Sequence, residues 1–174
     1  MKPLWTPSPA RAARSSMARF MARAGVSGTY DELHRWSVEK KEDFWNLLWD
    51  FCQVRGAKGA RTLVDGDRMP GAKWFPDGRL NFAENLLRER DDSDAIVFWG
   101  EDKIKRRLSR NQLHDLVSRL QQALSAAGVG KGDRVAGYLP NLPETVAAML
   151  ATTSLGAIWS SCSPDFGVQG VLDR

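Results

Sequence analysis

The chain has 174 residues, of which 43% are hydrophobic and 26% are charged. This length suits one domain, or one domain with an N-terminal appendage, and the composition excludes an intrinsically disordered chain. The net charge of +4 is concentrated at the start, because residues 1–25 carry five basic side chains and no acidic one. No apolar run of about 18 residues is present, so we expect no membrane span.

The first 25 residues predict a basic amphipathic helix over positions 10–24. Two interpretations of it stay open: a helix that docks on the folded body, or an organellar transit peptide, which is typically rich in Arg and poor in acids. Trp5 and the nearby prolines favour the docking helix. The residues expected on its apolar face are Ala13, Met17, Phe20, Met21 and Ala24.

Residues 1–94 predict helices and irregular segments. We expect Ser37 to cap a helix that runs to Cys52, with an aromatic stripe from Phe44 to Phe51 in the core. Residues 55–68 are rich in Gly and predict a loop, whereas residues 80–87 predict a helix. The charged run 88–94 predicts a linker. We therefore expect a domain boundary between residues 94 and 95.

From residue 95 onward, strands and helices alternate. Residues 95–99 and 104–108 predict an antiparallel pair. Ser109 and Gln112 predict a capping box for a helix that ends at Gly128. A strand over 134–139, a helix capped by Asn141, a strand over 157–161 and a helix opened by Ser163 follow. The predicted fold class is α/β: an incomplete parallel βαβ sheet, preceded by a helical and irregular extension.

Few residues indicate chemistry. The glycine-rich run 128–132 follows a helix and precedes a strand, which predicts a tight turn and not a phosphate loop. His34 and His114 are isolated, and we assign no metal ligand and no catalytic residue. The basic run 103–107 predicts a solvated turn without neighbouring aromatic rings, so we expect no nucleic-acid partner. The default ligand site is the crevice at the carboxyl ends of the strands, at residues 139–141 and 160–163.

Several segments resemble one enzyme family. The run from Gly128 to Ala151, with its KGDRV and PETVAAMLA stretches, is similar to the adenylate-forming acyl-CoA synthetases. Residues 69–76 and 80–87 resemble the acetyl-CoA synthetase branch. Residues 157–168, together with Trp5–Pro7 and Trp36–Val38, are similar to the acetoacetyl-CoA synthetases. The resemblance covers essentially the whole chain but only about the first quarter of a family member, so we expect an N-terminal fragment.

The resemblance implies an acid–thiol ligase that forms acetoacetyl-CoA, AMP and pyrophosphate from acetoacetate, CoA and ATP through an acyl adenylate, with Mg²⁺. The family's phosphate loop and catalytic Lys are not in this chain, so we expect the chain alone to be inactive and to bind no cofactor tightly. The spacing from Phe166 to Arg174 matches a CoA-binding arginine of the acetyl-CoA synthetases, which makes Arg174 a candidate CoA contact.

Two alternatives to this function remain open. The chain could belong to another short-chain acyl-CoA synthetase of the acetyl or propionyl type, or it could be a non-catalytic binding module with a basic amphipathic anchor at residues 10–24. Cys52 and Cys162 lie in apolar stretches and predict two buried, reduced thiols. With no secretory signal in the sequence, the expected location is the cytoplasm.

Overall fold

The computed structural model describes residues 4–174, and its contacts divide the chain into two compact units, with the boundary in the sequence between Arg79 and Leu80. The boundary expected between residues 94 and 95 falls inside the second unit. These units are defined by contacts and not by family domains, so the domain boundary expected between residues 94 and 95 stays a prediction. Each unit is described by itself.

The first unit begins with four short helices: α1 (Pro9–Ala13), α2 (Ser16–Ala24), α3 (Tyr30–Glu39) and α4 (Lys41–Phe51). The single helix predicted over residues 10–24 is wrong, because the Ser15 side chain accepts a hydrogen bond from Ala18 N at 3.1 Å and caps a new helix there. Ala13 therefore lies on a different helix from Met17 and Phe20. The apolar face expected over this stretch is reduced to residues of α2.

Aromatic rings form the core of the first unit. Phe20 of α2 is buried, and its ring lies edge to face against Phe44 and Phe51 of α4, with centroids 5.7 and 5.1 Å apart. It also meets Trp36 of α3 at 6.4 Å. Such edge-to-face pairs are favourable because the positive ring edge meets the negative ring face. The interpretation of α2 as a docking helix is consistent with these contacts.

The helix start expected at Ser37 is wrong. Ser37 lies inside α3, where its hydroxyl donates to the carbonyl of His34 at 2.7 Å. Thr29 caps α3, with Glu32 completing a capping box. The chain leaves helical geometry only at Lys40, which starts α4 without a side-chain cap.

The rest of the first unit is irregular, as the glycine-rich stretch predicted. Two short antiparallel strands, β1 (Leu63–Val64) and β2 (Lys73–Trp74), pair within it. The segment is tied to α4 by Asn46, whose amide donates to the buried Thr62 hydroxyl at 2.6 Å. Trp45 and Trp49 of α4 also contact the rings of Trp74 and Phe75.

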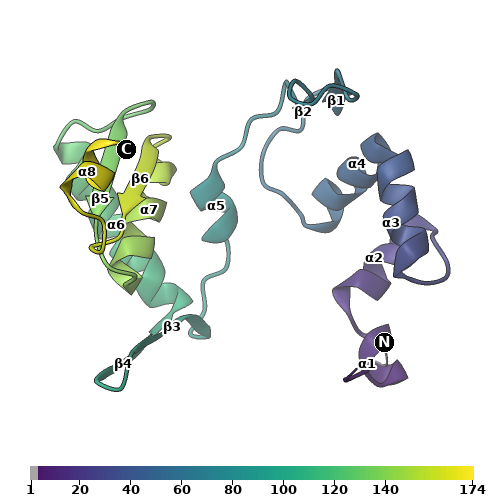
Figure 1. Cartoon of the computed structure of the whole chain (residues 1–174), viewed down its shortest axis with the longest axis horizontal. Coiled ribbons are helices and arrows are strands. Elements are labelled where there is room, and N and C mark those ends of the chain that lie inside the picture. The colour runs from purple at the N-terminus through teal and green to yellow at the C-terminus, as the bar shows by residue number, and fades with distance from the viewer. Residues whose placement is uncertain (1–3) are drawn as a thin grey trace. The chain divides into compact units, whose positions relative to one another are not determined.

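The second unit contains the predicted alternation of strands and helices (Figure 1). Strands β3 and β4 form an antiparallel hairpin, and β5 and β6 pair in parallel, joined through α7. The predicted antiparallel pair and the predicted βαβ unit are both confirmed. The elements are α5 (Phe82–Leu86), β3 (Asp94–Gly100), β4 (Ile104–Ser109), α6 (Arg110–Ala126), β5 (Arg134–Tyr138), α7 (Pro143–Ser154), β6 (Ile158–Cys162) and α8 (Val168–Leu172).

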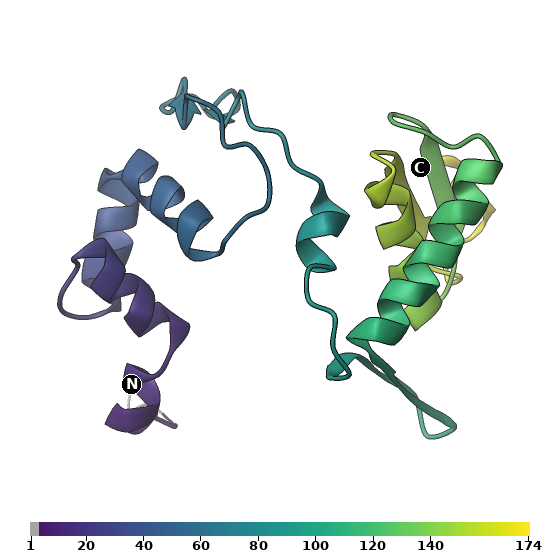
Figure 2. The same cartoon turned by 180° about the vertical axis from the view of Figure 1, so that it is seen from behind.

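The core of the second unit lies between α6 and α7, which run side by side in both views (Figures 1 and 2). Ala147 and Ala151 of α7 are completely buried, and such small side chains let neighbouring elements approach closely. Leu113 and Val117 of α6 and Leu150 of α7 complete the buried cluster, together with Ala83 of α5. This core holds α7, and with it the ends of β5 and β6 that flank α7, in place.

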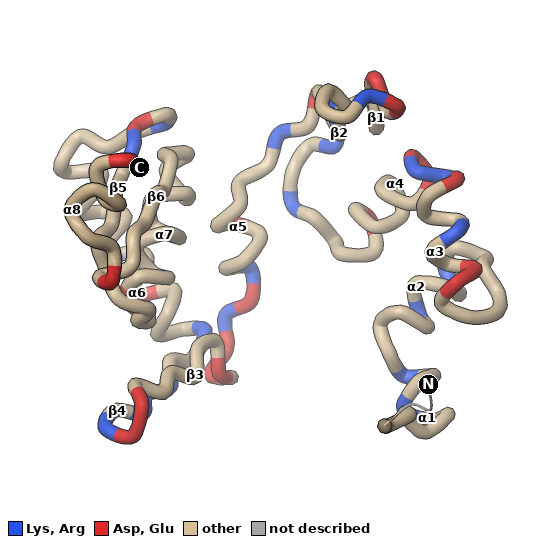
Figure 3. The backbone as a smooth tube through the Cα atoms, in the orientation of Figure 1, with Lys and Arg blue, Asp and Glu red and all other residues tan. Residues whose placement is uncertain are grey.

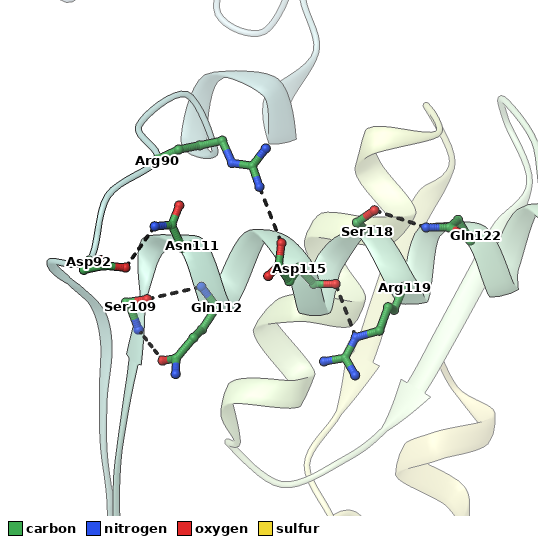
Figure 4. A network of polar contacts seen from close by, with 9 residues as sticks. All are labelled: Arg90, Asp92, Ser109, Asn111, Gln112, Asp115, Ser118, Arg119 and Gln122. Atoms are coloured by element: carbon green, nitrogen blue, oxygen red, sulfur yellow. Dashed lines mark hydrogen bonds and ion pairs between the residues drawn. The ribbon is translucent and has the colours of Figure 1, made fainter.

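The charged segment 88–94 is fastened to the start of α6 (Figure 4). Arg90 forms an ion pair with Asp115 at 3.4 Å, and Asn111 donates to Asp92 at 2.9 Å. The predicted capping box is confirmed: the Ser109 hydroxyl accepts from Gln112 N, and the Gln112 side chain accepts from Ser109 N. The first two turns of α6 thus hold both the preceding strand and the charged segment.

Candidate functional site

The candidate site is a hollow of about 300 Å³ on one face of the β5–β6 pair. It extends from the Arg134–Ile158 end of the two strands to the Tyr138–Cys162 end. Val171 of α8 and Arg174, which follows α8, also belong to its wall. Alternation along β5 makes Arg134, Ala136 and Tyr138 more exposed than the residues between them. The lining is mainly apolar, with cationic and hydroxyl groups among its side chains.

Close packing between β5 and β6 explains why residue 137 is a glycine. A Cβ atom on Gly137 would lie 2.6 Å from the Trp159 ring, far inside van der Waals contact. Glycine at position 137 therefore makes room for Trp159 on the neighbouring strand. The ladder continues past the strands, since Leu139 N donates to Cys162 O at 3.2 Å. The two carboxyl ends are consequently held together.

The side chains expected to cap helices at these carboxyl ends do not do so. Leu142 is the N-cap of α7 and Gly167 that of α8, so the caps predicted at Asn141 and Ser163 are wrong. Asn141 is exposed, and Ser163 forms a local turn in which its hydroxyl accepts from Asp165 N at 3.4 Å. Pro143 occupies the first turn of α7, as predicted.

Tyr138 ties the end of β5 to the loop after β6. Its hydroxyl lies 2.8 Å from the carbonyl oxygen of Pro164 and 3.2 Å from that of Phe166, so its proton is donated within this short segment. The tyrosine side chain is 55% exposed and lines the hollow. A strand that was expected only as scaffold thus holds the loop leading into α8.

Arg174 lies in the wall of the hollow, where its guanidinium carbon is 4.8 Å from the centroid of the Phe166 ring. Arg134 is the second cation of the wall, and its guanidinium donates to Gly132 O at 3.4 Å. No carboxylate belongs to the lining residues, so the local charge favours an anion. The CoA contact predicted for Arg174 remains a prediction.

The first acid after the carboxyl end of β5 already has a partner. Glu144, in the first turn of α7, accepts a hydrogen bond from Arg106 of β4 at 2.6 Å. This hydrogen bond is the main reason why the pKa of Glu144 lies below its ordinary value, and the backbone and the positive charge of Arg106 add to the effect. Glu144 is therefore an ionised structural carboxylate and no candidate base.

The remaining sequence candidates lie outside the hollow. Residues 128–132 turn the chain between α6 and β5, as predicted, with positive φ at Gly128 and Gly132. His34 stacks on Tyr30 in the first unit, and His114 is half-buried on α6. Within residues 4–174, no cluster of His, Cys, Asp and Glu side chains suits a metal ion. Cys162 is buried as predicted, but Cys52 is exposed, so that part of the expectation is wrong.

The basic run at the β3–β4 hairpin is exposed, and both charge signs meet at its tip (Figure 3). Arg106 pairs with Glu144, and Arg107 pairs with Asp94. The expectation of no neighbouring aromatic ring is wrong for Lys105, whose ammonium lies 4.4 Å from the centroid of the Trp99 ring. Each of these three cations therefore has a partner within the hairpin or on α7.

Sequence reasoning overlooked Arg134 and Tyr138, which line the hollow, and Phe166, which contacts Arg174 of its wall. Tyr138 carried a detectable signal, because it lies next to the carboxyl end of the strand predicted over 134–139. Arg134 begins that strand, and nothing in its spacing predicted that Arg174 would line the same hollow. Phe166 was used only to count to Arg174, although its ring turns out to contact that arginine.

Comparison with known proteins decides the family. A family model described as AMP-binding enzyme matches residues 82–173, more than half of the chain. The chain belongs to the AMP-binding enzyme family. A second model, described as the N-terminus of acetyl-coenzyme A synthetase, matches residues 30–86. Acyl-CoA synthetases among the AMP-binding enzymes use ATP and CoA.

Individual AMP-binding enzymes refine the assignment. The chain is 57% identical to an acetoacetyl-coenzyme A synthetase of Rhizobium meliloti over 99% of its own length and 27% of the relative's. It is 39% identical to a malonamoyl-CoA synthetase of Penicillium aethiopicum over 84% of this chain and 21% of the relative. A solved acetoacetyl-CoA synthetase of Streptomyces lividans matches the fold with a TM-score of 0.91 and 42% identity, over 100% of this chain and 28% of that one.

These matches confirm the predicted homology to acetoacetyl-CoA synthetases and the predicted fold class. The chain spans about a quarter of the length of the curated relatives that it matches. Within residues 4–174, no helix is long and apolar enough to cross a membrane.

Proposed function

We propose that this chain is the N-terminal part of an acetoacetate–CoA ligase. In the intact enzyme, a carboxylate oxygen of acetoacetate attacks the α-phosphorus of ATP, and pyrophosphate leaves. The CoA thiolate then attacks the acyl carbon of the adenylate, and AMP leaves with the bonding electrons of the C–O bond. The observation that carries the proposal is the 57% identity to the Rhizobium meliloti acetoacetyl-coenzyme A synthetase across 99% of this chain.

In the same proposal, Mg²⁺ accompanies ATP, and Arg174 contacts an anionic group of CoA. The support for Arg174 is its place in the wall of a hollow that has two guanidinium groups and no lining carboxylate. A guanidinium suits a phosphate because it offers several N–H donors in one plane. Within residues 4–174, no cluster of three or more His, Cys, Asp and Glu side chains could hold the metal.

We further propose that the enzyme works on small molecules in the cytoplasm and has no nucleic-acid partner. Three of the four cations of the basic run 103–107, namely Lys105, Arg106 and Arg107, already have partners in the chain. The membrane-anchor alternative is weakened in the same way. Phe20, the main apolar residue of that anchor, is buried against α3 and α4.

A second candidate substrate is favoured by one relative. The chain is also similar in sequence to the malonamoyl-CoA synthetase, a protein named for malonamate. Acetoacetate and malonamate both carry a carbonyl group β to the carboxylate, and they differ in a methyl group against an amide nitrogen. Short acids with a β-carbonyl therefore form the proposed substrate class, and acetate and propionate fall outside it.

The test is substrate competition with the intact protein that contains this chain. Purified enzyme would receive ATP, CoA and equimolar acetoacetate, malonamate and acetate, and the three thioesters would be separated and quantified. We expect acetoacetyl-CoA to dominate, with acetyl-CoA lowest. A larger yield of acetyl-CoA would refute the proposal, and a dominant malonamoyl-CoA would move it to the second candidate. Residues 1–174 alone serve as the control and should form no thioester.

A further inference from the structure

The loop between β6 and α8 is fixed from outside by one side chain. Tyr138, at the end of the neighbouring strand β5, donates its hydroxyl proton to the carbonyls of Pro164 and Phe166, which lie 2.8 and 3.2 Å away. Inside the loop, Phe166 N donates to Ser163 O at 3.1 Å, which closes a turn. The backbone on both sides of Asp165 is thereby tied to the β5–β6 sheet.

Phe166 extends this tie to Arg174. The guanidinium carbon lies 4.8 Å from the centroid of the Phe166 ring, within the range in which the ring quadrupole attracts a cation. Asp173, the acid next to Arg174, is engaged elsewhere, because its carboxylate accepts from Gln169 at 2.6 Å. The aromatic ring is therefore the contact that orients the guanidinium.

The length of α8 makes such support necessary. Val168–Leu172 is a helix of five residues, and isolated helices shorter than about 12–15 residues are marginal in water. A side chain that follows so short a helix has no fixed direction unless other contacts supply one. The sheet supplies it here through Tyr138, the loop backbone and the Phe166 ring.

From these contacts we infer that Tyr138 and Phe166 are positioning residues for CoA binding and act through Arg174. Tyr138 holds the loop to the sheet, and Phe166 holds the guanidinium over its ring. The guanidinium is thus oriented before CoA arrives, which lowers the ordering cost of binding. The inference rests on the proposed CoA contact of Arg174.

The test measures KM for CoA and KM for ATP in the intact enzyme with single and double substitutions. We expect Arg174→Ala to raise KM for CoA about tenfold, as for loss of a charge-assisted hydrogen bond. Phe166→Leu should raise it about three- to fivefold, and Tyr138→Phe about two- to fivefold. Phe166→Tyr keeps the aromatic face and should restore the original KM. KM for ATP should stay unchanged throughout.

The double variant separates positioning from direct contact. If Phe166 acts through Arg174, then Phe166→Leu should have no further effect on KM for CoA when Arg174 is already Ala. An additional rise in the double variant would overturn the inference, and so would an unchanged KM in Phe166→Leu alone. An unchanged KM for CoA in Arg174→Ala would refute the proposed CoA contact and, with it, this inference. The proposed activity would then still be tested separately by thioester formation from acetoacetate.

Discussion

In the first unit the packing is carried by aromatic rings that meet edge to face, whereas in the second it is carried by aliphatic side chains between helices. Phe20 stands at the centre of the first cluster, among rings from α3 and α4. In the second cluster Ala147 and Ala151 are fully buried beside Leu150, and α6 supplies Leu113 and Val117. Large rings fill space with few residues, while small residues bring backbones close together.

This difference has a structural consequence for the site. Aromatic rings are large enough to contact an irregular segment, as when Trp45 and Trp49 contact Trp74 and Phe75, in tilted pairs, in a segment with little secondary structure. Close helix packing instead fixes α7 relative to α6, and α7 joins the two strands of the hollow. The precise element positions that a ligand site needs therefore belong to the second unit.

This difference in packing predicts that the Phe20 ring contributes most to the stability of the first unit. Phe20→Ala removes a side chain that is only 6% exposed and contacts three rings, so the free energy of unfolding of this unit should fall by about 3–5 kcal/mol. Urea unfolding followed by tryptophan fluorescence would measure the loss, because Trp36, Trp45 and Trp49 all lie on α3 and α4.

Met17→Ala is the matched control for this experiment. Met17 lies on the same helix but is 48% exposed, and its substitution should change the stability by less than about 0.5 kcal/mol. Equal losses for the two variants would mean that the aromatic cluster does not hold the first unit together.

The next largest effect on stability is expected for Asn81, a polar side chain of the second unit. Asn81 accepts from Glu84 N at 3.0 Å, which caps α5, and its amide donates to the carbonyls of Thr153 and Ser154 at the end of α7, each at 3.1 Å. Asn81→Ala leaves one helix start and one helix end without partners. The free energy of unfolding should fall by about 1–2 kcal/mol.

Asn141→Ala provides the control for this prediction, since Asn141 is exposed and caps no helix. Hydrogen exchange of the amides of α5 and α7 would report the opening of each helix separately. Faster exchange of these amides is expected for Asn81→Ala alone. If Asn141→Ala increased their exchange equally, the double role of Asn81 would be wrong.

The helix caps show where sequence reasoning succeeds and where it fails. The capping box at Ser109 was predictable because both partners are local and no proline intervenes. At α7, Pro143 forces the residue before it into extended geometry, and Leu142, with φ −118° and ψ 159°, becomes the N-cap. Asn141 is one residue too early to reach the first amides of the helix.

Distant contacts explain the other misses. The break at Lys40 carries no local signal, yet it lets Trp36 and Phe44 both face Phe20 from different helices. The helix expected at Ser163 starts later, at Val168, and the residues between are held by Tyr138 from another strand. The hollow itself depends on that contact. The antiparallel pair and the βαβ unit could be predicted from local pattern, but the side chains around Arg174 could not.

The smallest expected effect concerns an exposed ion pair of the second unit. Arg106 donates to Glu144 at 2.6 Å, and the pKa of Glu144 consequently lies below its ordinary value of 4.5. A lowered pKa means that the unfolded chain takes up the proton first, so the stabilisation is complete above pH 4.5 and is lost as the pH falls through the lower folded pKa. Because both side chains are 40% or more exposed, the contribution should be below about 1 kcal/mol.

Glu144→Gln would measure this contribution. The variant should be slightly less stable than the original chain near neutral pH, and the difference should shrink in acid, where Glu144 is also uncharged. Added salt at neutral pH should shrink it as well, because exposed charges are screened. The first unit offers a comparison in Asp77, whose pKa is lowered chiefly by the hydrogen bond from Arg61. Asp77→Asn should show the same direction of change with pH. A difference for Glu144→Gln that persisted at low pH would mean that hydrogen-bond geometry, and not charge, joins β4 to α7.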